Sequence, residues 1–282
     1  MSSSWIFLTL VYGLLKGARE IVKKESLKKS SVVEVLFFYT LFAFLICIPA
    51  SNDIASIDTK YLPAIFIKSF VIFIAWILSF RAIKSLPISL YGILDLSRVL
   101  FATLLGIFVL KEAVTRNQII GLVCVVLGLV FLKKRKSDED ENVKPLVVVL
   151  ALLSCVLNAV SGFLDKVLTK FVTPSQLQFY YMLFLTLLYL TYLIIDRSEI
   201  NIKSSVKNYW IWILAILFVI ADKSLFVANA NPASKITIMT LIKQSGCLIT
   251  IAAGKLIYHE KNMLHKFVCA TVIIAGIVIA VL

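Results

Sequence analysis

The sequence has few charged residues and almost no histidine. Only 16% of its 282 residues are Asp, Glu, Lys or Arg, whereas 60% are hydrophobic, and the two histidines are His259 and His265. A soluble domain of this size does not carry so apolar a composition. The shortage of histidine argues against metal-dependent or histidine-based catalysis. The composition therefore indicates an integral membrane protein.

Cysteine motifs and nucleotide-binding motifs are missing as well. The five cysteines all lie in apolar runs and have no C-x-x-C spacing, so we expect neither a disulfide framework nor a metal site. The sequence has no phosphate-binding loop and no HExxH or GxSxG motif. We therefore expect no cofactor and no enzymatic activity.

The net charge of +13 does not indicate nucleic-acid binding. The basic residues lie in short connections between apolar runs, where Lys and Arg set the orientation of a membrane protein. Eighteen of the 29 lie in connections after odd-numbered runs and six in connections after even-numbered runs. The positive-inside rule then predicts that the odd-numbered connections are cytoplasmic and both termini are outside. Membrane lipid, not nucleic acid, is the expected surrounding partner.

Ten apolar runs are long enough to cross a bilayer as helices, which takes about 20 apolar residues. Strands are excluded because the runs are continuous rather than alternating. The first run lacks the basic start and cleavage site of a signal peptide, so we expect it to be retained. All six prolines lie at the ends of runs, so no sharply broken central helix is expected. The expected spans are 4–22, 31–50, 62–84, 87–110, 117–133, 146–166, 175–195, 208–228, 235–257 and 265–282.

The charged segment at 133–144 divides the runs five and five. A shift of 148 residues places Glu112 on Glu260 and Gly128 on Gly276, which favours an internal repeat over chance similarity between two apolar halves. Because each unit has an odd number of spans, the second is inverted relative to the first, an arrangement typical of transporters. The expected division is a first five-helix repeat at 1–134, a charged linker at 135–144 and a second five-helix repeat at 145–282.

Two stretches carry a family resemblance: "FRAIKSLPISLYG" with "LKEAVTRNQIIGLVCVVLGLVFL" in the first half, and "ANANPASKITIMT" with "IYHEKNMLHKFVCATVIIAGIVIAVL" in the second. They resemble the EamA-type repeats of the drug/metabolite transporter superfamily. Lys16 and Lys166 look like the lysine that this family has in the first helix of each repeat. The second half departs from the pattern, because Cys269 stands where the first half has Gly121 and the entry to its fourth span is displaced.

The resemblance implies ten helices in two inverted repeats, a central cavity lined mainly by spans 1, 3, 4, 6, 8 and 9, and alternating access. Members of the superfamily move amino acids, nucleotide sugars, other metabolites and drugs, and some flip lipid-linked sugars.

A few ionisable residues lie within the spans, where each costs about 2.5–3.5 kcal/mol unless it faces a cavity or a partner. Asp95 and Arg98 share a helix face at i, i+3 and are expected to pair. We expect Lys243, which the repeat aligns with Asp95, to pair with Asp222 and to form a gate. Lys16 either takes part in coupling or only extends to the cytoplasmic surface. Lys68 and Lys223 are ranked below these.

The candidate substrate-binding residues follow from polarity within the spans, although for each aromatic residue simple packing is the alternative. They are Arg98, Lys243, Asp95, Gln244, Tyr12, Trp76, Tyr91 and Asn158. The candidate coupling or gating residues are Asp222, Asp95 and Lys16. Glu112 and Glu260 are expected to complement helix ends.

The sequence thus predicts an all-α membrane protein with ten transmembrane helices. We expect it to be a secondary transporter of a small polar organic metabolite, either amino-acid-like or anionic, in the cell (inner) membrane. The alternatives are a flippase subunit for a lipid-linked sugar and a non-transporting structural membrane subunit. Homodimerisation is left open.

Overall fold

The structure is a computed structural model that describes residues 4–50, 53–110, 115–134, 143–196, 202–234, 239 and 242–281. Within these ranges the chain forms helices and connections, without strands. The helices are α1 (Ser4–Ser26), α2 (Val32–Cys47), η1 (Ile48–Ala50), η2 (Ile54–Ser56), η3 (Thr59–Tyr61), α3 (Leu62–Ser85), α4 (Ile88–Asp95), α5 (Arg98–Leu110), α6 (Arg116–Lys134), α8 (Pro145–Leu168), α9 (Pro174–Asp196), α10 (Ile202–Lys207), α11 (Tyr209–Ala230), α13 (Gly246–Leu256) and α14 (Met263–Val281).

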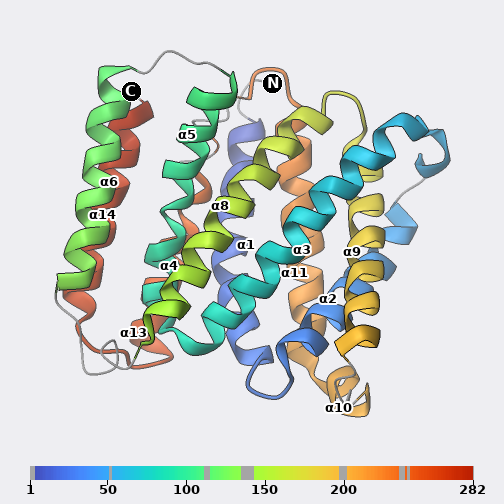
Figure 1. Cartoon of the computed structure of the whole chain (residues 1–282), viewed down its shortest axis with the longest axis horizontal. Coiled ribbons are helices and arrows are strands. Elements are labelled where there is room, and N and C mark those ends of the chain that lie inside the picture. The colour runs from blue at the N-terminus through green and yellow to red at the C-terminus, as the bar shows by residue number, and fades with distance from the viewer. Residues whose placement is uncertain are drawn as a thin grey trace.

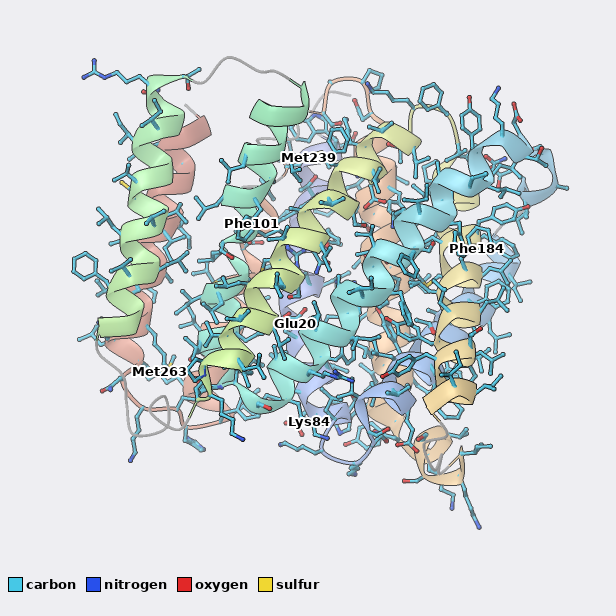
Figure 2. The ribbon with its side chains drawn as sticks, viewed as in Figure 1. Glu20, Lys84, Phe101, Phe184, Met239 and Met263 are labelled. Carbon is cyan, nitrogen blue, oxygen red and sulfur yellow. The ribbon has the colours of Figure 1, made fainter. Side chains whose placement is uncertain are left out.

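Several of these helices can cross a membrane. The four that are long and apolar enough lie in Thr59–Ser85, Pro145–Leu168, Pro174–Ile195 and Tyr209–Ala230. Shorter apolar helices are Val32–Cys47, Ile119–Phe131, Gly246–Leu256 and Met263–Gly276. Many large apolar side chains point outward (Figure 2), as lipid contact requires. The expected all-α membrane protein is confirmed.

The helices pair across the charged segment that divides the sequence. Helix α1 packs on α11 and α3 on α8, while α2 packs on α9, α4 on α13 and α6 on α14. Both chain ends lie on one side of the bundle, and the connections from α1 to α2 and from α3 to α4 lie on the other (Figure 1). Every one of these pairs joins the first half to the second, as two inverted repeats do.

Proline marks the helix starts, as expected. Pro63, Pro145 and Pro174 lie in the first turns of α3, α8 and α9, where the missing N–H group leaves no helical hydrogen bond unmade. Pro87 directly precedes α4. A capping box opens α2, because the Glu34 carboxylate and the Ser31 hydroxyl each accept the other residue's backbone N–H.

The expectation that the central helices are unbroken is wrong at two places. The fourth expected span is interrupted by a turn at 96–97, between α4 and α5, and the ninth by a turn at 244–245, before α13. In both turns the N–H groups bond three residues back instead of four. Proline is not the cause. Each turn contains a serine, a residue of low helix propensity, and Gly246 directly follows the second turn.

The two turns lie 148 residues apart, the same interval at which the sequence aligns with itself. Short tightened stretches within helices often mark hinges. The charged linker predicted at 135–144 lies outside the described residues apart from its last two positions, and so does Glu112.

Candidate functional site

Two cations on one face of helix α1 pair with aspartates of other helices. Lys16 and Arg19 are three residues apart, so their side chains project one above the other. Lys16 pairs with Asp95 of α4, and Arg19 Nη1 donates to Asp222 Oδ1 of α11 at 3.2 Å. Helix α1 is therefore bound through charge both to the first half and to the second.

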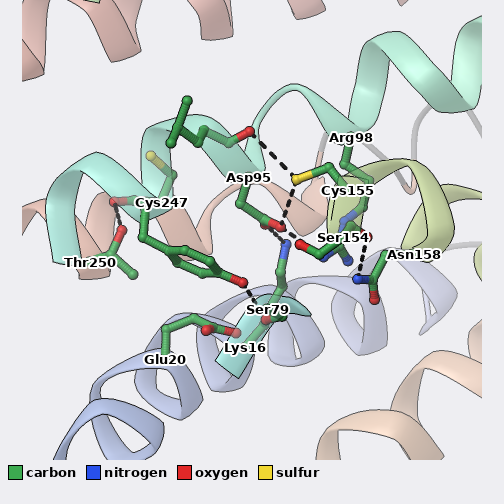
Figure 3. Close-up of polar contacts among 12 residues, drawn as sticks. Lys16, Glu20, Ser79, Asp95, Arg98, Ser154, Cys155, Asn158, Cys247 and Thr250 are labelled. Carbon is green, nitrogen blue, oxygen red and sulfur yellow. Dashed lines mark hydrogen bonds and ion pairs between the residues drawn. The ribbon is translucent and has the colours of Figure 1, made fainter. Parts of the chain in front are cut away.

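Asp95 is the centre of a buried triad beside the first turn. Arg98 Nη2 donates to Asp95 Oδ1 at 2.7 Å, which confirms the ion pair expected from the i, i+3 spacing. Lys16 Nζ donates to Oδ2 of the same carboxylate, and the Cys155 thiol lies 3.9 Å from Oδ1 (Figure 3). Lys16 is 6% exposed, so it faces this carboxylate and does not extend to the surface.

Lys243 precedes the second turn and has a different environment. Its Nζ lies 5.7 Å from the centre of the Tyr12 ring, and it forms no ion pair with the described carboxylates. The expected pair between Lys243 and Asp222 is wrong, because Arg19 binds that aspartate. Arg19 lies near the end of the first expected span and was counted among the basic residues of the following connection, so it was not expected in the site.

Glycines bring α1 into direct backbone contact with the second turn. A Cβ atom on Gly13 would lie 2.3 Å from Ser245 Oγ and 2.8 Å from the carbonyl oxygen of Ile242. One on Gly17 would lie 2.6 Å from the carbonyl oxygen of Gly246. Small residues four apart allow this close approach of helices in membranes. The second turn is therefore held against α1 by shape rather than by an ion pair.

A second buried pair, Asp165 of α8 with Lys68 of α3, was not expected. Asp165 Oδ1 lies 3.1 Å from Lys68 Nζ, and both side chains are almost fully buried. Lys68 Nζ also lies 3.3 Å from the centre of the Tyr181 ring, a cation–π contact. Asp165 falls near the end of its expected span, where a carboxylate reads as an interfacial residue, and only the packing of α8 on α3 shows its burial.

The ionisable residues form one electrostatically connected group. Asp222 interacts with Lys68 and Asp165, and Asp165 interacts with Lys243. Lys243 in turn interacts with Arg98 and Lys16. These residues lie on α1, α3, α4, α5, α8 and α11 and just before the 244–245 turn, which are the six spans that the resemblance implied would line the centre.

The remaining expected site residues have several environments. Tyr12 lies in this group, with Lys243 over one side of its ring and Arg19 Cζ 5.9 Å from its centre. Gln244 is buried within the second turn. Asn158 Nδ2 donates to the Ser154 carbonyl oxygen at 2.7 Å, in the preceding turn of its own helix. Tyr12 and Gln244 are thus the two that border Lys243.

Trp76 and Tyr91 pack with other side chains. The Trp76 ring lies 5.3 Å from that of Tyr39 and 5.2 Å from that of Phe218, and these rings join α2, α3 and α11. The Tyr91 hydroxyl lies 2.6 Å from Ser79 Oγ. These contacts give both residues a place in the packing, which was the alternative to substrate binding.

Polar contacts between helices lie near the starts of the two interrupted spans. Glu260 Oε1 accepts the Ile88 N–H at 2.6 Å at the start of α4, and Lys24 Nζ donates to the Leu86 carbonyl oxygen just before it. In the second half, Lys166 Nζ donates to the Asn229 carbonyl oxygen at 2.8 Å. The expectation that Glu260 complements a helix end is confirmed.

A small cavity lies beside the first turn, between α1, α4 and α13. It is lined by Lys16, Gly17, Glu20, Tyr91, Gly92, Asp95, Gly246, Cys247 and Thr250. Its size suits about one water molecule, so the halves must separate before an organic molecule can reach Asp95. Among the described residues, no three His, Cys, Asp or Glu side chains are grouped so that they could hold a metal ion.

Comparison with known proteins gives a family match for the first part of the chain. Residues 3–133 match the EamA-like transporter family, which supports a multi-pass membrane transporter of the drug/metabolite transporter superfamily. No curated protein matches the sequence. A solved crystal structure, described only as that of a protein, is similar with a TM-score of 0.70 and 14% identity over 99% of this chain and 98% of its own. That likeness shows the fold.

Proposed function

We propose that this chain, whose first half belongs to the EamA-like transporter family, is a secondary transporter that moves a small polar organic metabolite by alternating access. In this proposal ten transmembrane helices form two inverted five-helix repeats, with the charged segment between them, and the protein resides in the cell (inner) membrane. Two observations support the repeat. The interval of 148 residues between the two turns equals the repeat shift, and the helices pair between the halves.

The observation that carries the proposal is the convergence of buried charges from both halves. Ionised side chains are costly within a membrane and usually mark a substrate or ion pathway. Here the Lys16–Asp95–Arg98 triad and Lys243 lie at the two turns, where spans 4 and 9 are interrupted, and ion pairs connect α1 to α4 and to α11. A rocking motion of the halves changes the distances between these charges, which is the property that an alternating-access site needs.

Arg98 and Lys243 are the proposed substrate-binding cations, with Tyr12 and Gln244 beside them. Asp222 is the first candidate for energy coupling, because one cation binds it whereas two bind Asp95. Loss of that single partner during the conformational change would free the Asp222 carboxylate to take up a proton.

The test is uptake of metabolites by liposomes that contain the purified full chain. We expect Arg98→Ala and Lys243→Ala to abolish transport while both variants still insert, and unchanged uptake in both would remove these residues from the site. An Asp222→Asn protein that keeps the full pH dependence of transport would exclude Asp222 from coupling. Flipping of a labelled lipid-linked sugar without uptake of soluble solutes would favour a flippase, and absence of both activities would favour a structural subunit.

A further inference from the structure

The group of ionisable residues described above has more positive than negative charge, and the buried Lys23–Glu20 ion pair beside it on α1 is neutral. Its cations are Lys16, Arg19, Lys68, Arg98 and Lys243, and its anions are Asp95, Asp165 and Asp222. Asp222 compensates Arg19, and Asp165 compensates Lys68. The carboxylate of Asp95 is shared by two cations, and Lys243 has no carboxylate of its own among the described residues. Two positive charges therefore remain uncompensated.

The two excess charges belong to the two turns. One lies in the triad at the first turn, where Arg98 has its Nη2 on Asp95 while its Nε is buried without a hydrogen-bond partner among the described residues. The other is Lys243, directly before the second turn. Helix α1 lies beside both cations: Tyr12 is next to Lys243, and Lys16, one turn later on the same helix face, binds the Asp95 carboxylate that Arg98 also binds. The two cations thus lie beside adjacent turns of one face of α1, one from each half of the chain.

Two like charges that share a region of low dielectric repel each other, and each is costly without a counter-ion. An anionic ligand offsets both costs. A guanidinium presents a planar set of donors to a carboxylate or phosphate, and an ammonium group acts as a compact point charge. The pair Arg98 and Lys243 is therefore suited to a ligand with negative charge at two positions or on one doubly charged group.

We propose that the transported substrate is a doubly charged organic anion, either a dicarboxylate or a phosphate monoester, that bridges Arg98 and Lys243 across the two turns. This inference rests on the proposed transport function and names its substrate class. A monoanion leaves one of the two positive charges uncompensated, and a zwitterionic amino acid brings a further cation into the site. Both bind more weakly than a dianion of similar size.

Tyr12 limits the size of the ligand near Lys243, because its ring lies beside the ammonium group and α1 is fixed there by the backbone contacts of Gly13. The ligand replaces repulsion between the halves by a shared attraction. It therefore draws the two turns together, so that the loaded protein changes its conformation more readily than the empty one.

The experiment measures binding to the purified full chain in nanodiscs by calorimetry, with matched probes. Succinate is compared with its monomethyl ester, and glycerol 3-phosphate with glycerol, so that the two arms separate a dicarboxylate site from a phosphate site. We expect one dianion to bind at least about tenfold more tightly than its matched probe, a difference of about 1.4 kcal/mol. Uptake of the same dianion into liposomes should follow the same preference.

The variants Lys243→Gln and Arg98→Gln each remove one of the two charges. We expect either change to lower dianion affinity and to reduce the preference over the matched probe to less than about threefold, while size-exclusion profiles stay unchanged. The matched control is Lys223→Gln, because Lys223 Nζ bonds Ser175 Oγ away from the two turns. The control should keep the full preference.

The outcomes separate this inference from the proposed function. If neutral or zwitterionic solutes are transported while neither dianion binds or competes, the dianion proposal is wrong and the transporter proposal stands. If a dianion binds but both glutamine variants keep the preference, the placement at Arg98 and Lys243 is wrong. If a broad set of solutes that includes both dianions is neither bound nor moved, the proposed function itself fails, and this inference with it.

Discussion

The two turns occupy equivalent positions in the two halves but handle charge differently. At the first, Asp95 is bound by Lys16 and Arg98, and the Cys155 thiol lies close by. At the second, Lys243 lies beside an aromatic ring and has no ion pair with the described carboxylates. The first turn is held by electrostatic attraction and the second by close packing against the α1 glycines.

In the proposed inverted repeat, this difference means that two turns with the same backbone form can have different tasks. At the first turn both cations bind a carboxylate of the protein itself, so this turn is suited to keep the halves in register. The second leaves a cation without a bound anion, so it is suited to respond to a ligand. Removing a charged group is therefore expected to change stability in opposite directions at the two turns. Thermal unfolding can measure both changes without knowledge of the substrate.

The largest expected effect is that of Asp95→Asn, which leaves the buried Lys16 and the partly buried Arg98 without their shared anion. Breaking a buried ion pair by removing one partner costs about 3–5 kcal/mol, so we expect a large drop in the melting temperature in detergent and loss of transport. The Arg98→Gln variant should lose less, because Lys16 still neutralises Asp95. Equal melting temperatures for Asp95→Asn and the unaltered protein would show that the triad does not hold the first turn.

Gly13→Ala tests the packing that holds the second turn. The new Cβ atom would meet Ser245 Oγ at 2.3 Å and a backbone oxygen at 2.8 Å, so α1 must shift, at a cost of about 1–3 kcal/mol. The matched control is Gly162→Ala in α8, where a Cβ atom meets nothing within 4 Å. The control should be neutral or slightly stabilising. If the two variants have the same melting temperature, the contact between α1 and the second turn does not stabilise the protein.

Lys243→Met is expected to change stability in the direction opposite to Asp95→Asn. The substitution keeps a long side chain and removes a charge whose burial costs up to about 2.5–3.5 kcal/mol. We expect the ligand-free variant to gain about 1 kcal/mol while it loses transport. Thermal unfolding without added solute is the measurement. A destabilised variant would mean that Lys243 is a structural cation like Lys16, and the contrast between the turns would disappear.

Most of the spans could be predicted from the sequence because continuous apolar runs and proline positions determine where membrane helices begin and end. The Asp95–Arg98 pair was also accessible, since both residues lie on one helix and their spacing alone brings them together. The pairs of Lys16 with Asp95 and of Arg19 with Asp222 join residues 79 and 203 positions apart. They depend on how the helices are rotated and packed, which periodicity does not specify.

The turns were missed for a related reason. Without a proline, a tightened stretch differs from a regular helix by small changes in backbone angles, and the residues at 96–97 and 244–245 are compatible with either conformation. The interval of 148 residues between the two positions equals the repeat shift and could be read from the sequence. Only the backbone shows that both positions leave the helix. Asp165 was missed because its depth depends on the packing of α8 on α3.

The smallest expected effect extends the comparison to the entry of the first interrupted helix. Glu260→Ala removes the carboxylate that accepts the Ile88 N–H at the start of α4 and that lies 3.3 Å from Lys266 Nζ, and we expect a loss of about 0.5–1 kcal/mol in thermal unfolding. Glu260→Gln keeps an acceptor oxygen and should recover part of this loss. If both variants match the unaltered protein in stability but transport faster, the Glu260 contact acts as a latch that opens in each transport cycle. If glutamine recovers nothing, the charge on Glu260 matters more than the cap, because Lys266 would then be the partner that holds this connection against α4.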